Sequence, residues 1–319
     1  GGRPEEKPGC HMFQDKASVS RLKRQGFGLL LLANNHMLDY GRAGLEATIR
    51  EIADQQLDAI GAGLSYEEAY QPLRKTIGGL TIGFINACEA QFGVMDRVRP
   101  EGRAGYAWIN HSQIDKHILE LRRVCDYVLV FPHAGLENVP VPLARWRERY
   151  RHFCDLGADC VIGSHPHVPQ GIEMVDGSLI AYSLGNFVFG VHTDSYVGRH
   201  LPHSGESFVL LIDVDAGGVR SFDRVPCLIG QPPLERPRVL EGSEREQLAA
   251  YYAQLDAWLQ DEAFVRETWR RRVRAMLSTY IRRAAERDVE EVLDELVGRI
   301  ALVAENRSWL DEVMAMGRE

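Results

Sequence analysis

The sequence predicts an α/β fold over residues 17–190, and two features of its pattern support this class. Short apolar segments alternate along the chain with longer segments in which apolar residues recur at helical spacing. Such alternation is typical of layered folds, in which helices cover the sheets on both sides. The 319-residue chain is 45% hydrophobic and 26% charged, a composition that suits a globular protein with a sizeable core.

Five apolar segments are predicted strands, and four segments with helical periodicity are predicted helices. The predicted strands are residues 27–33, 79–86, 126–131, 158–163 and 179–186. The predicted helices are residues 17–25, 43–57, 111–124 and 142–157, of which the last ends at Gly157. The order of these segments places helices between successive strands, as an α/β sheet requires.

The pattern changes after residue 200. Residues 206–229 predict a β-hairpin with Gly217 and Gly218 in its turn. From about residue 242 the chain is rich in Arg and Glu and predicts two to four helices. We therefore predict two parts, a layered domain over residues 1–235 and a helical extension over residues 236–319.

The bulk properties narrow the class of function. The net charge is −8 and the pI is about 5.8, so the chain lacks the basic surface that nucleic-acid binding requires. Its six cysteines form no CxxC pair, and we expect neither a disulfide framework nor a zinc–thiolate site. No signal peptide or apolar run of about 18 residues marks a membrane span. The location of the protein, including an upstream membrane anchor, stays open.

Polar side chains follow four of the predicted strands, at the point where each strand ends. They are Asn34, Asn35 and His36 after the first strand, His133 after the third, Ser164, His165 and His167 after the fourth, and Gly185 and Asn186 after the fifth. Because ligands bind at the carboxyl ends of the strands of an α/β sheet, we expect these groups to share one pocket.

Imidazole is a good ligand for zinc, iron and manganese, which favours a metal site in this pocket. An extended backbone would point His165 and His167 to opposite faces, whereas a tight loop could let them reach two adjacent ions. Each histidine taken alone is more often an ordinary loop residue, and it is their combination that favours a site. Asp39 is either a group that orients a histidine or a turn residue before Gly41.

Five ordered blocks of the sequence resemble a known family. They are "LANNHMLDYGRAGLEATI", "GAGLSYEEA", "HAGLE", "GADCVIGSHPHVPQGIE" and "YSLGNFVFG". In this order they resemble the CapA family of capsule and poly-gamma-glutamate synthesis proteins, over residues 13–230. The resemblance implies a four-layer αββα core related to the calcineurin-like metallophosphoesterases.

The resemblance also implies roles for individual residues. Asn35, His133 and His165 would ligate one divalent ion, and His167 would ligate a second; manganese, iron and zinc all suit these ligands. His36 would be the catalytic histidine. The residues that would orient these groups or line the pocket are Asn34, Asp39, Glu137, Gly185 and Asn186. The implied reaction is phosphoester hydrolysis, in which a metal-bound hydroxide attacks an anionic phosphorylated or polymeric substrate.

The sequence departs from the family pattern upstream of Asn34. The family's Gly-Asp strand and Asn-x-Glu block, which supply further metal ligands, do not occur there. We expect the first strand of the fold to be missing, either because the chain is a fragment or because it is a truncated homologue. Two other functions stay open. One is a non-catalytic accessory of capsule or polyglutamate assembly that works with other synthesis proteins, and the other is a peptidase-like hydrolase.

Overall fold

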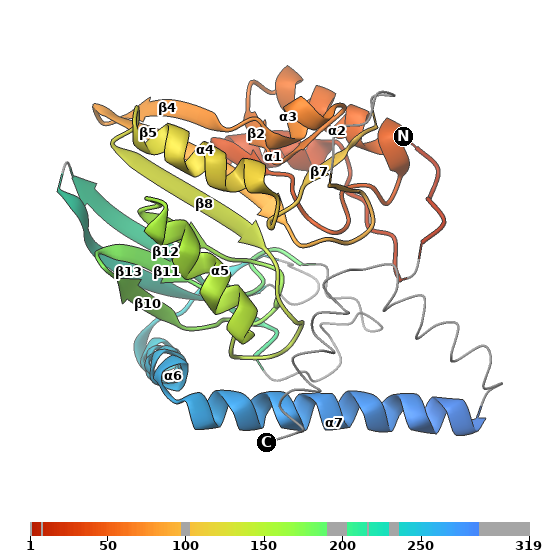
Figure 1. The fold of residues 1–319 in the computed structure, drawn as a ribbon, viewed down its shortest axis with the longest axis vertical. Coiled ribbons are helices and arrows are strands. Elements are labelled where there is room, and N and C mark those ends of the chain that lie inside the picture. The colour runs from red at the N-terminus through yellow and green to blue at the C-terminus, as the bar shows by residue number, and fades with distance from the viewer. Residues whose placement is uncertain are drawn as a thin grey trace.

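The computed structural model describes residues 2–7, 9–96, 103–189, 203–215, 217–229 and 236–286, and it confirms the predicted α/β class (Figure 1). A six-stranded sheet in the order β10-β11-β9-β8-β5-β4 forms its centre. Its strands are β4 (Leu73–Ile77), β5 (Leu80–Cys88), β8 (Tyr127–His133), β9 (Cys160–Ile162), β10 (Ile172–Val175) and β11 (Ser178–Ala181). β5, β8, β9 and β11 are parallel, and an antiparallel strand closes each edge.

Three smaller sheets accompany this central sheet. β1 (Leu29–Leu31) pairs in parallel with β2 (Asp58–Ile60). The second small sheet contains β3 (Ala62–Gly63), β6 (Val94–Met95) and β7 (Gly105–Ala107). The third contains β12 (Glu206–Asp215), β13 (Gly218–Leu228) and β14 (Arg238–Val239). The predicted hairpin is confirmed as β12–β13, although Gly218 already belongs to β13 and pairs with Asp215.

All of the helices except α3, which was not predicted, lie close to the predicted segments. They are α1 (Ala17–Arg24), α2 (Gly41–Asp54), α3 (Tyr66–Tyr70), α4 (Ser112–Arg122), α5 (Ala144–Asp155), α6 (Gly242–Gln260) and α7 (Glu262–Glu286). Two helices of the predicted extension are therefore observed, and the part of that prediction beyond residue 286 lies outside the described residues. None of the helices in the described ranges is both long enough and apolar enough to cross a membrane.

The side chains of the central sheet alternate between two cores, which gives the molecule its layers. Val128 and Val130 of β8 belong to the core that also contains the apolar faces of α4 and α5. Leu129, between them, packs into the core formed with β12, β13 and α6. A third core joins β1 to α2 through residues such as Leu32 and Leu45. One face of the central sheet is therefore covered by α4 and α5 and the other by β12, β13 and α6, which makes the fold a layered α/β structure.

The register of the parallel strands brings several strand ends together. Cys88 at the end of β5 pairs with His133 at the end of β8, and a bridge joins His133 to Ser164 beyond β9. Buried Asn86 connects this edge to β1, because its side chain accepts a hydrogen bond from Ala33 N and donates one to Phe131 O. The residues that follow β1, β5, β8 and β9 therefore meet in one place.

Candidate metal and catalytic site

His133 is the last residue of β8, and both of its ring nitrogens have close neighbours. Its Nε2 lies 3.2 Å from the side-chain oxygen of Asn35, which follows β1. Its Nδ1 lies 2.9 Å from Ser164 Oγ, beyond β9. The serine thus holds the outer side of the ring, while Nε2 faces the centre of the site.

The loop after β9 is a tight turn and not an extended segment. His165 and His167 both have left-handed backbone conformations, with φ of 99° and 61°. Their ring centroids lie 5.9 Å apart, so the two imidazoles are neighbours and do not point to opposite faces. Left-handed backbone is uncommon outside glycine and is typical of functional loops, where the fold holds the strain in place.

Asn35, His133 and His165 form a compact set of ligand atoms. His165 Nδ1 lies 3.2 Å from His133 Nε2, which in turn lies 3.2 Å from Asn35 Oδ1. Ligand atoms that each lie about 2.1 Å from a tetrahedral ion are separated by about 3.4 Å. Both of these separations are close to the spacing of ligand atoms around a single divalent ion.

His167 has its own outer partner. Its Nδ1 lies 2.8 Å from Asn186 Oδ1, and the Asn186 amide donates hydrogen bonds to His167 O and Ser204 O. Asn186 is therefore fixed at both ends of its amide and holds the His167 ring. The neighbouring Gly185 has φ of 80°, and a Cβ there would lie 2.4 Å from Glu206 O, so the chain passes too close for a side chain.

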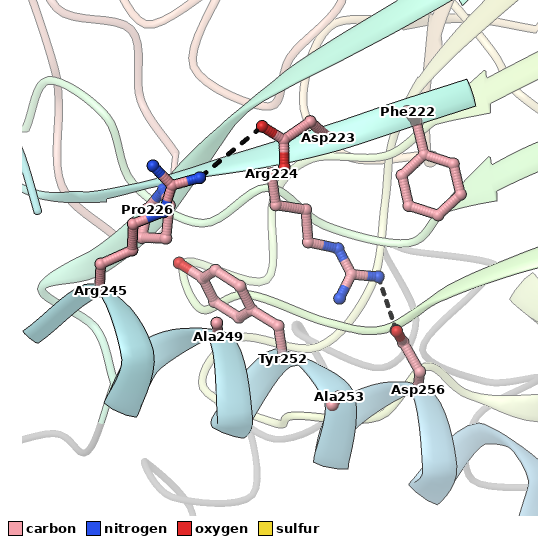
Figure 2. A pocket seen from close by; sticks show the side chains of 9 residues that line it. All are labelled: Phe222, Asp223, Arg224, Pro226, Arg245, Ala249, Tyr252, Ala253 and Asp256. Carbon is pink, nitrogen blue, oxygen red and sulfur yellow. Dashed lines mark hydrogen bonds and ion pairs between the residues drawn. The ribbon is translucent and has the colours of Figure 1, made fainter. Parts of the chain in front are cut away.

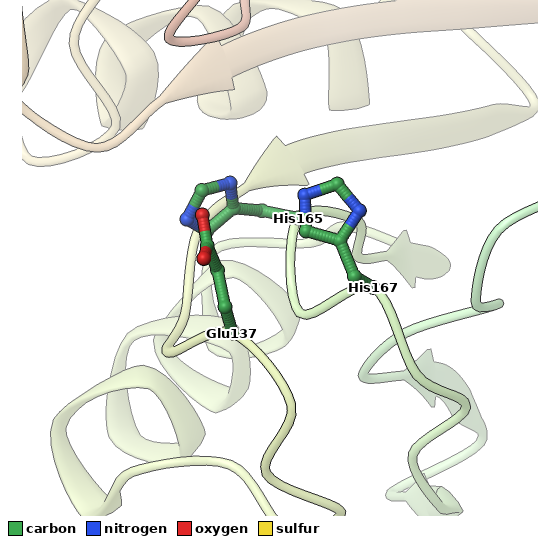
Figure 3. Close-up of side chains that lie close together, drawn as sticks. All are labelled: Glu137, His165 and His167. Atoms are coloured by element: carbon green, nitrogen blue, oxygen red, sulfur yellow. The ribbon is translucent and has the colours of Figure 1, made fainter. Parts of the chain in front are cut away.

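Glu137 also reaches this loop, as Figure 3 shows. One ligand atom from each of Glu137, His165 and His167 lies within 4.8 Å of the other two. Carboxylate and imidazole together suit manganese, iron or zinc. Glu137 therefore lies close enough to both histidines to be a ligand candidate itself, in addition to the orienting role expected from the sequence.

His36 lies on the turn after β1, where it is held by a buried carboxylate. Its Nδ1 is 2.8 Å from Asp39 Oδ2, and Asp39 is 1% exposed. The same carboxylate accepts a hydrogen bond from Met12 N, and its other oxygen lies 3.0 Å from Lys7 Nζ. Asn34 stays within its own turn, where its side chain accepts a hydrogen bond from His36 N. It therefore shapes the turn that carries His36.

Burial keeps the histidines of the site in the form that binds metals. It lowers the pKa of His133 well below 6.5, and the neighbouring histidines add to this shift. Burial also lowers the pKa of His165 and of His167. Because a neutral imidazole is the form that ligates a metal ion, these rings are ready to bind one at neutral pH.

Glu89 is a residue of this site that the sequence analysis missed. It directly follows β5 and is buried, and its Oε1 lies 3.7 Å from His165 Nε2. Burial raises the pKa of Glu89 to about 7. The rule that identified the histidines, a polar residue directly after an apolar strand, also applies to "INACEA" and would have found it.

A second hollow lies between β13 and α6, away from these residues (Figure 2). Two arginines border it, and both face carboxylates. Arg224 Nη2 lies 2.7 Å from Asp256 Oδ1, and Arg245 Nη2 lies 3.9 Å from Asp223 Oδ2. Its charges thus compensate one another, and none of the predicted site residues lines it.

Residues 2–191 match the model described as bacterial capsule synthesis protein PGA_cap. The chain belongs to this family. The CapA resemblance is thereby confirmed, since the relatives of this PGA_cap chain include the PGA biosynthesis protein CapA of Bacillus subtilis, 37% identical over 183 residues. Another is the capsule biosynthesis protein CapA of Bacillus anthracis, 33% identical over 182 residues.

The PGA_cap chain spans about half the length of these curated relatives. Each alignment covers 56% of the chain, against 47% of the B. subtilis protein and 44% of the B. anthracis protein. Among solved structures, the calcineurin-like phosphoesterase YfkN of Bacillus subtilis aligns with 76% of this chain. The alignment covers 74% of the YfkN chain, at 13% identity and a TM-score of 0.39. The 5′-nucleotidase of Candida albicans matches 76% and 45%, at 11% identity and a TM-score of 0.41.

Proposed function

We propose that this chain carries the metal centre of a phosphoester hydrolase that acts in capsule or poly-gamma-glutamate synthesis. The observation that carries the proposal is the convergence of Asn35, His133 and His165, whose ligand atoms are spaced as around one ion. Outer hydrogen-bond partners such as Ser164 fix the rings, as is usual for histidines that bind metals. The role in capsule or poly-gamma-glutamate synthesis is inferred from the relatives named CapA.

Asn35, His133 and His165 would hold the first ion, and His167 with Glu137 would hold a second. A divalent ion bound there lowers the pKa of water and stabilises the charge of a phosphoryl group. Burial at the site keeps the three histidine ligands neutral.

His36 supplies the acid of the reaction. Asp39 engages its Nδ1, so Nε2 is left to donate a proton to the leaving oxygen of the substrate. Asn34 fixes the turn on which His36 lies, so the donor nitrogen is held in one orientation.

The first experiment measures metal content by elemental mass spectrometry in the wild type and in His133→Ala. His152→Ala is the matched control, because this histidine lies on the exposed side of α5. The proposal predicts one or two equivalents of metal in the wild type and the control, and a loss in His133→Ala. Equal metal content in all three proteins, or none in any, would refute it.

The second experiment measures hydrolysis of a panel of phosphoesters by the metal-loaded protein. We expect turnover that falls at least 100-fold in His36→Ala, while its metal content stays the same. A metal-loaded protein without any turnover would instead favour an accessory role. A Mycobacterium tuberculosis relative, 25% identical over 247 residues, carries the name "Probable polyglutamine synthesis accessory protein", which favours this second candidate.

A further inference from the structure

Glu89 occupies the gap between the loops that carry the candidate ligands. Its backbone continues the edge of β5, where Glu89 N donates a hydrogen bond of 3.1 Å to His133 O. Its Oε2 accepts a hydrogen bond of 3.1 Å from Gly135 N. Its Oε1 accepts one of 2.6 Å from Gln91 Nε2 and faces His165. The carboxyl group is thus fixed by the segments that follow β5 and β8, and it turns one oxygen toward the loop after β9.

The orientation of the His165 ring brings one of its two nitrogens close to this oxygen. Nδ1 of His165 lies 3.2 Å from His133 Nε2, on the side of the metal ligands. The other ring nitrogen, Nε2, lies on the opposite side of the ring, 3.7 Å from Glu89 Oε1. A hydrogen bond needs about 3.0 Å, so a movement of about 0.7 Å by either side chain would form one.

We propose that Glu89 is a positioning residue for His165. Its carboxyl group accepts a hydrogen bond from the Nε2–H of His165, which leaves the proton on Nε2 and directs the Nδ1 lone pair toward His133. The inference rests on the metal centre of the proposed function. His133 and His167 already show the same arrangement, with Ser164 and Asn186 as outer partners. For His165, Glu89 is the corresponding outer partner.

The tautomer of His165 tests the proposal without any metal. Long-range ¹H–¹⁵N correlation spectra of the ¹⁵N-histidine-labelled, metal-free protein report which ring nitrogen carries the proton, and His165→Asn identifies the signal. We expect the Nε2–H tautomer in the wild type and an increased Nδ1–H population in Glu89→Gln. A wild-type His165 protonated mainly on Nδ1 would overturn the proposal.

Metal affinity gives the second readout, by calorimetric titration of Mn²⁺ and of Zn²⁺. Glu89→Gln keeps the shape of the side chain, but its amide cannot accept from both Gly135 N and His165 Nε2. We expect its metal affinity to fall about 10- to 100-fold. Glu120→Gln, on the exposed face of α4, is the control and should bind as the wild type does.

The outcomes separate this inference from the function on which it rests. Glu89→Gln binding within twofold of the wild type would overturn the role of Glu89 and leave the metal centre in place. A wild type that binds neither ion would refute the metal centre, while the tautomer measurement would still decide whether Glu89 orients His165. Thermal unfolding of each variant checks that the fold is retained.

Discussion

The side-chain oxygen of Asn86 accepts a hydrogen bond of 2.7 Å from the backbone nitrogen of Ala33. The amide nitrogen of the same side chain donates one of 2.8 Å to Phe131 O on β8. Asn86 therefore connects the central sheet to Ala33, which follows β1 and precedes the candidate ligand Asn35 by two residues. Gly61 leaves the space for this contact, since a Cβ there would lie 2.2 Å from Asn86 Oδ1.

Asn86→Ala should lower the free energy of unfolding by about 2–4 kcal/mol, because Ala33 N and Phe131 O both lose a buried partner. Urea denaturation measures this change. Gln71→Ala, at an exposed position, is the control and should change stability by no more than about 0.5 kcal/mol. If both variants unfolded at the same urea concentration, the connection would contribute nothing to the stability of the protein.

A paired substitution tests the close passage at Gly185. Gly185 and Gly177 have similar φ values, 80° and 88°, but a Cβ at Gly177 would meet nothing within 4 Å. Gly177→Ala should therefore cost about 1 kcal/mol from backbone strain alone. Gly185→Ala should cost about 2–4 kcal/mol, since it adds a clash with Glu206 O. Chemical denaturation of both variants measures the difference, and equal costs would contradict the predicted clash.

Removal of metal should destabilise the wild type and leave His133→Ala unaffected. An ion present at 100 times its dissociation constant stabilises the folded state by about 2.7 kcal/mol. Thermal unfolding with Mn²⁺ and with excess chelator measures this change in both proteins. An equal response from His133→Ala would show that the ion binds elsewhere.

The pair of Arg151 and Glu173 should make stability depend on acid pH. Burial alone would raise the pKa of Glu173, but hydrogen bonds from Arg151 and Tyr182 outweigh this effect and lower the pKa. A lowered pKa in the folded state means that the unfolded chain binds the proton more tightly. The stabilisation is therefore complete above about pH 4.5 and is lost as the pH falls further.

Urea denaturation at pH 6, 4.5 and 3 tests this dependence. The wild type should lose more stability between pH 6 and 3 than Glu173→Gln, which has no proton to gain at this position. Parallel losses in the two proteins would show that other carboxylates account for the acid sensitivity.

The sequence predicted the parallel strands of the central sheet because each is an uninterrupted apolar segment, and it predicted the long helices because their apolar periodicity is strong. In α5, for example, the aromatic residues at helical spacing, Trp146, Tyr150 and Phe153, are all buried in the structure. Several of the strands that the sequence did not predict are two or three residues long, such as β2 and β3. Segments this short have no periodicity of their own, and pairing with distant residues alone makes them strands.

The same distinction applies to the candidate site, where local sequence identified some residues but not their contacts with distant parts of the chain. His133, His165 and His167 could be predicted because each lies at or shortly after the end of an apolar strand. Which partner each ring has could not be predicted, because the pairing with Ser164, Asn186 or Glu89 depends on which loop lies beside which in space. The sequence analysis also left the loop of His165 and His167 undecided, since left-handed backbone has no clear signal in histidine.

That backbone affects how any scan of the metal loop should be designed. A left-handed residue favours glycine or asparagine, so alanine at position 165 or 167 would change two things at once, the ligand atom and the ease with which the chain turns. Loss of metal in such a variant would not distinguish chemistry from conformation. Asparagine removes the imidazole while tolerating the turn, and glycine removes the side chain altogether. A matched pair of these substitutions at each position therefore separates what the ring binds from what the loop requires.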